Sequence, residues 1–189
     1  MHRTLFALAA LGLLASAPAE AGFLGAEMSA SYRYPDVSTV YGSAAFTPAT
    51  FTVTDGPGVE TTGLVENVTS LPVQFTDSTL TITLNTTLTN PTWTATDFNG
   101  ILFALTGPGS LGIVAATVDP STTLAGFGDS RVTFTDSTIG INWQGLTYHD
   151  GEQVVVRFTF AVPEPTSIVT LGVGCVGLIA AGLRRRLNS

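Results

Sequence analysis

The sequence predicts an all-β protein, an antiparallel β-sandwich or jelly-roll-like domain, and three observations lead to this prediction. Threonine, a β-branched residue with high strand propensity, fills 27 of the 141 positions from residue 22 to residue 162. Short runs alternate apolar and polar residues with a period of two, which is typical of half-buried antiparallel strands. Clusters of Gly, Pro, Asn and Asp separate these runs at a spacing that favours about eight to ten strands.

The individual strands follow from this alternation. Residues 78–85 place Leu80, Ile82 and Leu84 on one face of a strand and three threonines on the other. Two runs, 100–106 and 111–118, are more continuously apolar and are therefore expected as central strands. No helix is expected between the two ends of the chain. The remaining expected strands span residues 50–55, 131–135, 138–143 and 154–160.

A five-residue segment occurs twice. Residues 75–79 and 134–138 both have the sequence FTDST, and each copy stands between an incoming and an outgoing strand. Because an aspartate at the start of a turn can bond to its own backbone two residues on, both copies are predicted to be hairpin turns. The repetition has two interpretations: two related halves of the domain, or separate use of one favourable turn.

The expected domain, residues 22–162, is acidic. It contains no lysine, three arginines and twelve acidic residues, and its net charge is therefore −9. Such a surface repels nucleic acid, because binding to phosphates requires basic side chains. The one cysteine of the chain, Cys175, lies outside this range. We therefore expect no nucleic-acid partner, no disulfide and no thiolate metal site in the domain.

Residues 1–21 are predicted to be a secretory signal peptide. Arg3 makes the start positive, residues 5–15 are apolar, and small residues then allow cleavage after Ala19-Glu20-Ala21 or, alternatively, after Ala17. The apolar run of 11 residues is too short to span a hydrocarbon core about 30 Å thick. This argues against a permanent N-terminal anchor and makes the secretion machinery an expected partner.

A single transmembrane helix is predicted over residues 167–183. Its uncharged part, 168–183, has 16 residues, equivalent to about 24 Å of helix, and flanking residues can extend it. Arg184, Arg185 and Arg186 follow, and they are expected to stay cytoplasmic as a stop-transfer signal because positive charge resists translocation. Residues 22–162 then form an extracytoplasmic domain, and the inner membrane is an expected partner.

The segment Pro163-Glu164-Pro165 precedes this helix and is expected to be an extended, exposed linker, because proline denies it a continuous helical backbone. This segment, the Gly-containing apolar run and the arginine cluster resemble in their order the PEP-CTERM sorting signal of Gram-negative bacteria, here spanning residues 163–189. The resemblance implies recognition of Pro163, Glu164 and Pro165 by exosortase, a membrane-embedded transpeptidase-like enzyme. It also implies processing for the cell surface or the exopolysaccharide matrix. The alternative is a plain single-pass anchor.

The same C-terminal signature is also named an ice-binding protein C-terminal domain. Rows of alternating threonines at 50–54, 79–83 and 94–96 could present hydroxyl and methyl groups to ice, although a twisted sandwich does not keep such rows in register. The body of the chain also resembles the β-rich part common to many small PEP-CTERM proteins, and this likeness implies no activity.

No catalytic site, metal site or cofactor is predicted. His149 has neither a G-x-S-x-G serine nor other His or Cys ligands to work with, and we expect a solvated residue beside an Asp-Gly hairpin turn. Four aspartates near expected turns could supply oxygen ligands to calcium, but no calcium-loop spacing occurs, and such residues more often stabilise the turns themselves. These aspartates are Asp119, Asp129, Asp136 and Asp150.

Aromatic residues leave one binding hypothesis open. Trp93, Trp143 and Tyr148 could form a platform on which sugar rings stack, or they could fill the core of the sandwich. We therefore expect an exported, non-enzymatic protein that exosortase processes and that belongs to the envelope or the exopolysaccharide matrix. The alternative is a carbohydrate-binding or ice-binding surface domain.

Overall fold

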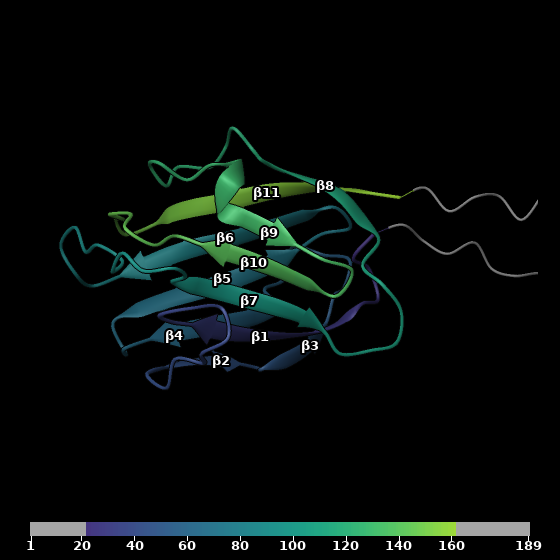
Figure 1. The fold of residues 1–189 in the computed structure, drawn as a ribbon, viewed down its shortest axis with the longest axis horizontal. Coiled ribbons are helices and arrows are strands. Elements are labelled where there is room, and N and C mark those ends of the chain that lie inside the picture. The colour runs from purple at the N-terminus through teal and green to yellow at the C-terminus, as the bar shows by residue number, and fades with distance from the viewer. Residues whose placement is uncertain (1–21, 162–189) are drawn as a thin grey trace, which may run out of the picture. The chain divides into compact units, whose positions relative to one another are not determined.

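The computed structural model describes residues 22–161 and confirms the all-β prediction. Eleven strands form two antiparallel sheets that pack face to face as a β-sandwich (Figure 1). One sheet has the strand order β3-β1-β7-β10-β9, and the other β2-β4-β5-β6-β11-β8. The elements are β1 (Glu27–Arg33), β2 (Ala44–Thr47), β3 (Thr50–Thr52), β4 (Thr61–Val65), β5 (Thr69–Phe75), β6 (Thr79–Thr86), β7 (Gly100–Leu105), β8 (Ile113–Val118), the 3₁₀ helix η1 (Asp129–Arg131), β9 (Val132–Phe134), β10 (Thr138–Asn142) and β11 (Glu152–Phe160).

The predictions for the two ends of the chain lie outside the described residues. Within residues 22–161, no helix is long and apolar enough to cross a membrane. The helical element of this part, η1, is three residues long. The predictions that lie outside are the signal peptide with its cleavage residues Ala19 and Ala21, the segment Pro163-Glu164-Pro165, the helix 167–183, and Arg184, Arg185 and Arg186.

Strand β6 shows how the alternating pattern builds the core. Leu80, Ile82 and Leu84 are completely buried between the sheets, whereas the intervening threonines are partly exposed on the outer face. Burying a side chain of this kind contributes about 1.5–3 kcal/mol. Phe75 and Phe103 from opposite sheets meet edge to face, with ring centroids 5.3 Å apart. Apolar packing of this kind holds together a domain whose sequence contains no cysteine.

The prediction of central strands is right for β7 and wrong for β8. β7 lies in the middle of the five-stranded sheet and pairs with β1 and β10. β8 is an edge strand of the six-stranded sheet, and its Val114 is 56% exposed. Small apolar residues make the β8 segment look hydrophobic, but an apolar run by itself does not fix where a strand stands in a sheet.

Both copies of the FTDST segment form hairpin turns, as predicted. One turn joins β5 to β6 and the other joins β9 to β10, so the two copies lie in different sheets. The hydroxyl of Thr76 accepts the Thr79 N–H at 3.1 Å, and the hydroxyl of Thr135 accepts the Thr138 N–H at 3.0 Å. The threonine at the start of each turn, and not the aspartate, therefore closes it.

The described chain begins and ends side by side. The buried ring of Phe23 packs edge to face against Phe158 and Phe160, at centroid distances of 5.0 and 4.9 Å. β1 leads away from this end of the sandwich, and β11 leads back to it (Figure 1). β11 is nine residues long, which corresponds to about 30 Å at ~3.4 Å per residue. The β4–β5 turn and the β6–β7 and β10–β11 loops form the opposite end, which we call the distal end.

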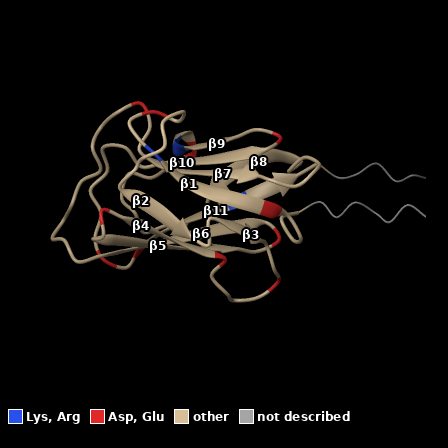
Figure 2. Cartoon of the chain, turned by 90° about the horizontal axis from the view of Figure 1, so that it is seen from below, with Lys and Arg blue, Asp and Glu red and all other residues tan. Residues whose placement is uncertain are grey.

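Acidic residues gather in the turns and loops, as Figure 2 shows. The arginines of the described part bond to their own chain. Arg33 donates to the Ser38 carbonyl at 3.1 Å, and Arg131 to the Gln144 carbonyl at 2.9 Å. Arg157 forms an ion pair with Asp119. Each arginine of this part therefore bonds to groups of its own chain, and acidic residues dominate the charge of the exterior.

Candidate functional site

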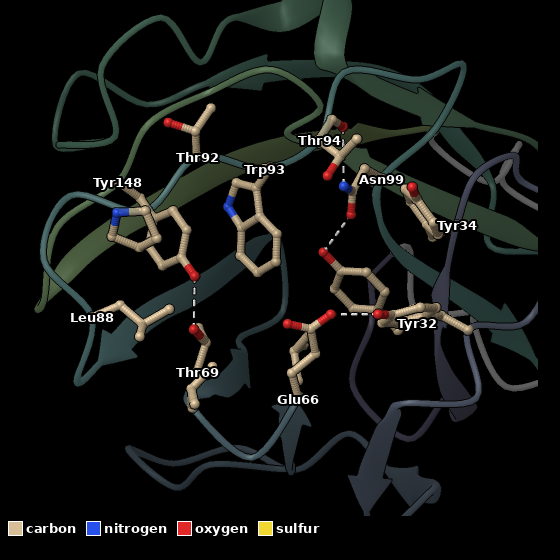
Figure 3. Close-up of a pocket in the computed structure, with 14 residues that line it drawn as sticks. Tyr32, Tyr34, Glu66, Thr69, Leu88, Thr92, Trp93, Thr94, Asn99 and Tyr148 are labelled. Carbon is tan, nitrogen blue, oxygen red and sulfur yellow. Dashed lines mark hydrogen bonds between the residues drawn. The ribbon is translucent and has the colours of Figure 1, made fainter.

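A small cavity opens at the distal end of the sandwich. Its volume is about 200 Å³, which is below the range of roughly 300–1,000 Å³ typical of sites for drug-sized ligands. Its walls come from β1, the β4–β5 turn and the β1–β2, β6–β7 and β10–β11 loops (Figure 3). It can therefore accept a small ligand or a single unit of a larger one. The lining residues are Tyr32, Tyr34, Tyr41, Val65, Glu66, Val68, Thr69, Leu88, Pro91, Thr92, Trp93, Thr94, Asn99 and Tyr148.

Two loops are joined by backbone hydrogen bonds to form one wall of this cavity. The Trp93 N–H donates to the Leu146 carbonyl at 2.9 Å, and the Tyr148 N–H donates to the Pro91 carbonyl at 3.0 Å. This short antiparallel pairing stacks Trp93 on Tyr148, with centroids 4.6 Å apart and planes 8° from parallel. Main-chain hydrogen bonds therefore hold this wall together, independently of the side chains that line the cavity.

A buried polar network lies behind the cavity. The Trp143 indole N–H donates to the Tyr32 hydroxyl at 2.8 Å, and that hydroxyl donates to Asn99 Oδ1 at 2.7 Å. Asn99 Nδ2 in turn donates to the Thr94 carbonyl at 3.1 Å. Burial raises the pKa of Tyr32 well above its ordinary value. The phenol therefore stays neutral and keeps both of its hydrogen bonds at all moderate pH values.

Glu66 stands at the rim of the cavity in an unusual backbone conformation. Glu66 and Asn67 have φ values of 51° and 58°, the pair of positive angles that a two-residue type I′ hairpin turn requires. Such turns favour Asn and Gly, and a left-handed conformation costs a residue such as glutamate about 1–3 kcal/mol. Strain of this kind gathers at functional sites more often than elsewhere.

The Glu66 carboxylate accepts a hydrogen bond from the Tyr41 hydroxyl through Oε1. This bond raises the pKa of Tyr41, because the phenol proton is held by a carboxylate. Glu66 itself is exposed to solvent. The turn therefore presents a carboxylate, fixed on one side by Tyr41, to the mouth of the cavity.

Trp93 contributes a donor that the protein leaves unused. Its side chain is 7% exposed, and among the residues that the structure describes, its Nε1 is the one buried side-chain polar atom without a hydrogen-bond partner. In Figure 3 the indole nitrogen lies on the side of the ring that faces Tyr148 and Leu88, among the side chains that line the cavity. An unpaired buried donor is uncommon in a folded protein and calls for an explanation.

The structure brings together the three aromatic residues that the sequence singled out, but not as an open platform. Trp93, Trp143 and Tyr148 are 7%, 0% and 3% exposed. Trp93 stacks on Tyr148 and also on Trp143, the latter at a centroid distance of 5.4 Å. Their ring faces are thus occupied by one another, and of the two interpretations the core-filling one is correct. Trp93 and Tyr148 also line the cavity.

The other candidate residues stabilise the loops in which they lie. Asp119 Oδ1 accepts the Ser121 N–H at 2.8 Å, and Asp129 Oδ1 accepts the Val118 N–H at 2.6 Å. Asp150 Oδ1 bonds in the same way to the Thr86 N–H at 2.9 Å. Asp136 is exposed in the β9–β10 turn. In residues 22–161 no three His, Cys, Asp or Glu side chains gather into a metal site.

His149 is a solvated residue beside an Asp-Gly turn, as predicted. Its side chain is 58% exposed, and its Nδ1 lies 3.4 Å from Glu152 Oε1. Gly151 has the positive φ of 78° that this turn needs. His149 does not line the cavity, whose single acidic residue is Glu66.

The threonine rows do not form one surface. Residues 50–52 belong to β3 of the five-stranded sheet, residues 79–83 belong to β6 in the middle of the other sheet, and residues 94–96 lie in the β6–β7 loop. The hydroxyls therefore do not stand in one flat, regularly spaced array of the kind that ice binding requires.

Sequence reasoning missed the other polar residues of the cavity. Tyr32, Tyr41 and Asn99 carry no local signal that distinguishes them from core or loop residues. Glu66 had one: a Glu-Asn pair between two apolar alternating runs occupies the place where a tight hairpin turn favours Asn-Gly.

No protein-family model, curated protein or solved structure matches the chain, so its function has to be inferred from its own residues.

Proposed function

We propose that this chain is an exported, surface-sorted, non-enzymatic protein that exosortase processes through its C-terminal segment. The observation that carries the proposal is the order of three features in the sequence: Pro163-Glu164-Pro165, an uncharged apolar segment, and Arg184 to Arg186. A signal peptide over residues 1–21, cleaved at Ala19-Glu20-Ala21, would deliver residues 22–162 across the inner membrane.

Each part of the C-terminal segment has a distinct role in this proposal. The two prolines keep Pro163-Glu164-Pro165 extended, so that exosortase can bind it. A helix over residues 167–183 holds the chain in the inner membrane until processing. Arg184, Arg185 and Arg186 stop translocation from the cytoplasmic side. After processing, the domain belongs to the cell surface or the exopolysaccharide matrix.

The fold of the domain supports this role. Phe23 packs against Phe160, so the described chain ends close to where it begins and leaves both flanking segments free to extend from one end of the domain. The acidic exterior keeps such a domain soluble and discourages contact with anionic lipid. The cavity has one carboxylate, whereas glycoside hydrolysis usually needs a pair, and this supports a non-enzymatic role.

The proposal is tested by the intact mass of the protein recovered from the envelope of a host that contains exosortase. The wild-type chain should have lost the residues that follow the region of Pro165. The double variant Pro163→Ala, Pro165→Ala should keep its tail and stay in the inner membrane. Pro57→Ala, a proline change in the exposed β3–β4 loop, is the matched control and should be processed normally.

Two results would contradict the proposal. A full-length tail on wild-type protein at the cell surface would reduce the C-terminal segment to a simple anchor. A chain truncated before Pro163 that still fractionates with the envelope like the intact protein would show that the segment is not what retains it.

A further inference from the structure

We propose that the distal cavity is a binding site for one ring of a neutral sugar, either free or as a unit of a polysaccharide. The site combines an aromatic wall, an unpaired buried donor and a fixed carboxylate acceptor. A sugar ring offers matching groups: C–H faces that pack against the edges of the aromatic rings and against apolar side chains, and hydroxyls that both donate and accept hydrogen bonds. The proposal concerns the folded domain and does not depend on how the chain is sorted.

The unpaired Trp93 Nε1 is the first step in the argument. Backbone bonds to Leu146 and Gly145 fix the main chain of Trp93. Stacking on Tyr148 and Trp143 holds the indole ring, so the ring cannot easily turn to find another acceptor. A buried donor without a partner is costly. Nε1 is itself shielded from solvent, so a ligand oxygen reaches the edge of the indole once a neighbouring side chain such as the exposed Leu88 shifts aside. That contact would remove the cost, and a sugar hydroxyl is an oxygen acceptor of suitable size.

Glu66 supplies the second hydrogen-bonding group. Its Oε1 is bonded to Tyr41, and its second carboxylate oxygen can accept from a ligand hydroxyl at the mouth of the cavity. The left-handed conformation of Glu66, with φ of 51°, is unfavourable for folding alone. A departure from local preference of this kind is expected where a residue serves binding rather than stability.

The charge of the walls selects among ligands. No Lys, Arg or His lines the cavity, and Glu66 gives it one negative charge. Acidic sugars and phosphorylated ligands would meet this carboxylate and a domain of net charge −9, and they are therefore disfavoured. An organic cation would gain from the carboxylate and the aromatic rings, but it has no acceptor for the Trp93 N–H. A neutral polyhydroxylated ligand satisfies both groups.

The surroundings allow a longer chain to continue beyond one ring. A second hollow of about 480 Å³ adjoins the cavity and shares Glu66 with it. Its other walls are small or polar residues, apart from Leu64. A polysaccharide chain could therefore extend along this hollow, but no aromatic residue there would bind a second ring. It is lined by Gly42, Ser43, Ala44, Ala45, Leu64, Glu66 and Asn67.

The test is calorimetric titration of the full-length protein in a detergent without a sugar head group. The probes are glucose, galactose, mannose, N-acetylglucosamine and, as a competing class, choline. At least one neutral sugar should bind saturably in the millimolar range. Trp93→Phe keeps the stacked ring but removes the N–H, and it should weaken that binding about tenfold.

Two further variants complete the test. Glu66→Gln, at an exposed position, should weaken sugar binding several-fold while the protein stays folded, which circular dichroism checks. Asp136→Asn removes the same charge at the exposed β9–β10 turn, at the opposite end of β10 from the cavity, and should leave the affinity unchanged. If Trp93→Phe does not fold, Glu66→Gln against Asp136→Asn decides the question.

Several results would overturn the proposal. One is that no neutral sugar binds at concentrations up to tens of millimolar. Another is that choline binds and the sugars do not, which would make the site an aromatic cage for cations. A third is that folded Trp93→Phe and Glu66→Gln proteins bind the sugar as tightly as wild type, which would place the binding elsewhere.

Discussion

At the residue scale, Tyr32 is the hydrogen-bond partner of two buried side-chain atoms, Trp143 Nε1 and Asn99 Oδ1. Its hydroxyl accepts from Trp143 Nε1 at 2.8 Å and donates to Asn99 Oδ1 at 2.7 Å. One oxygen atom thus serves as acceptor and donor at once inside the core. The same contacts position Asn99 and Trp143 behind the cavity, so the stability of the domain and the shape of the site depend on one phenol.

Tyr32→Phe should lower the free energy of unfolding by about 2–4 kcal/mol, because it leaves a buried indole N–H and a buried amide oxygen without partners. Urea unfolding followed by circular dichroism measures this loss. Tyr34→Phe is the matched control: Tyr34 is only partly buried, and its change should be below about 0.5 kcal/mol. Equal losses in the two variants would show that the network contributes nothing.

Asp119 should make the stability of the domain depend on pH in the acidic range. The hydroxyl of Ser121, and after it the guanidinium of Arg157, lower the pKa of Asp119 from 3.8 to about 2. Because the folded state binds this proton less tightly than the unfolded state, the stabilisation is fully present above about pH 4. It is lost as the pH falls from there through about pH 2.

The difference in unfolding free energy between wild type and Asp119→Asn should therefore be largest near pH 6 and shrink steadily between pH 4 and pH 2. Urea unfolding at a series of pH values measures it, with Asp136→Asn as the control for losing one negative charge. A difference that stayed constant down to pH 2 would contradict the assigned role of the Ser121 and Arg157 contacts.

At the element scale, alternation identified the strands whose apolar residues point inward. The prediction for residues 78–85 differs from β6 by one residue at each end, and that for 154–160 misses only the start of β11. β4 was missed because its pattern is inverted: Thr61 and Gly63 face the core, whereas Leu64 is 43% exposed. A Cβ at Gly63 would lie 2.7 Å from the ring of Phe46, so glycine makes room for that ring.

β1 was missed for a different reason. Its buried residues, Met28, Ala30 and Tyr32, alternate with serines, and small residues on both faces give little contrast in hydropathy. β8 shows the opposite error, since its apolar residues led to a central position that the strand does not occupy. Both errors arise because a strand's neighbours, and not its own composition, decide which faces are covered.

Gly100 of β7 leaves no room for a side chain against β10. This residue pairs with Asn142 of β10, and a Cβ at Gly100 would lie 1.9 Å from the Ile141 carbonyl oxygen. Both contacts involve main chain, which cannot move unless the central strands separate. The absence of a side chain at this position is therefore a condition for the five-stranded sheet.

Gly100→Ala should lower the free energy of unfolding by at least about 3 kcal/mol or prevent folding. Gly58→Ala is the control, because a Cβ there meets no atom within 4 Å, and its effect should stay within about 1 kcal/mol. Both are measured by urea unfolding. A Gly100→Ala protein as stable as wild type would mean that β7 and β10 lie farther apart than described.

At the scale of the whole molecule, the cavity could not have been predicted from any one segment. Its walls come from β1, one hairpin turn and three loops, which meet only because the topology returns each of them to the distal end. The sequence identified Trp93 and Tyr148 as candidates for sugar binding. It did not indicate that their faces cover each other, nor that Glu66 and Tyr41 stand at the same opening.

The same topology predicts that the domain tolerates a change in where its chain starts. Phe23 and Phe160 are in contact, so a short Gly/Ser linker can join residue 161 to residue 22 without displacing either. New ends between Gly58 and Val59 would fall in an exposed loop away from the cavity. This circular permutant should fold, keep the far-UV circular dichroism spectrum of the parent domain, and lose no more than about 2 kcal/mol of unfolding free energy.

A second permutant, opened between Thr89 and Asn90 in the β6–β7 loop, tests the wall of the cavity separately. It cuts the segment that carries Trp93 and Pro91 into their pairing with the β10–β11 loop, and it should lose the protection of those amide protons in hydrogen exchange while the sheets stay protected. The two permutants thus separate the sandwich from the wall of its cavity. If the Gly58 permutant folded only with a long linker, residues 22 and 161 would not lie side by side, contrary to the packing of Phe23 against Phe160.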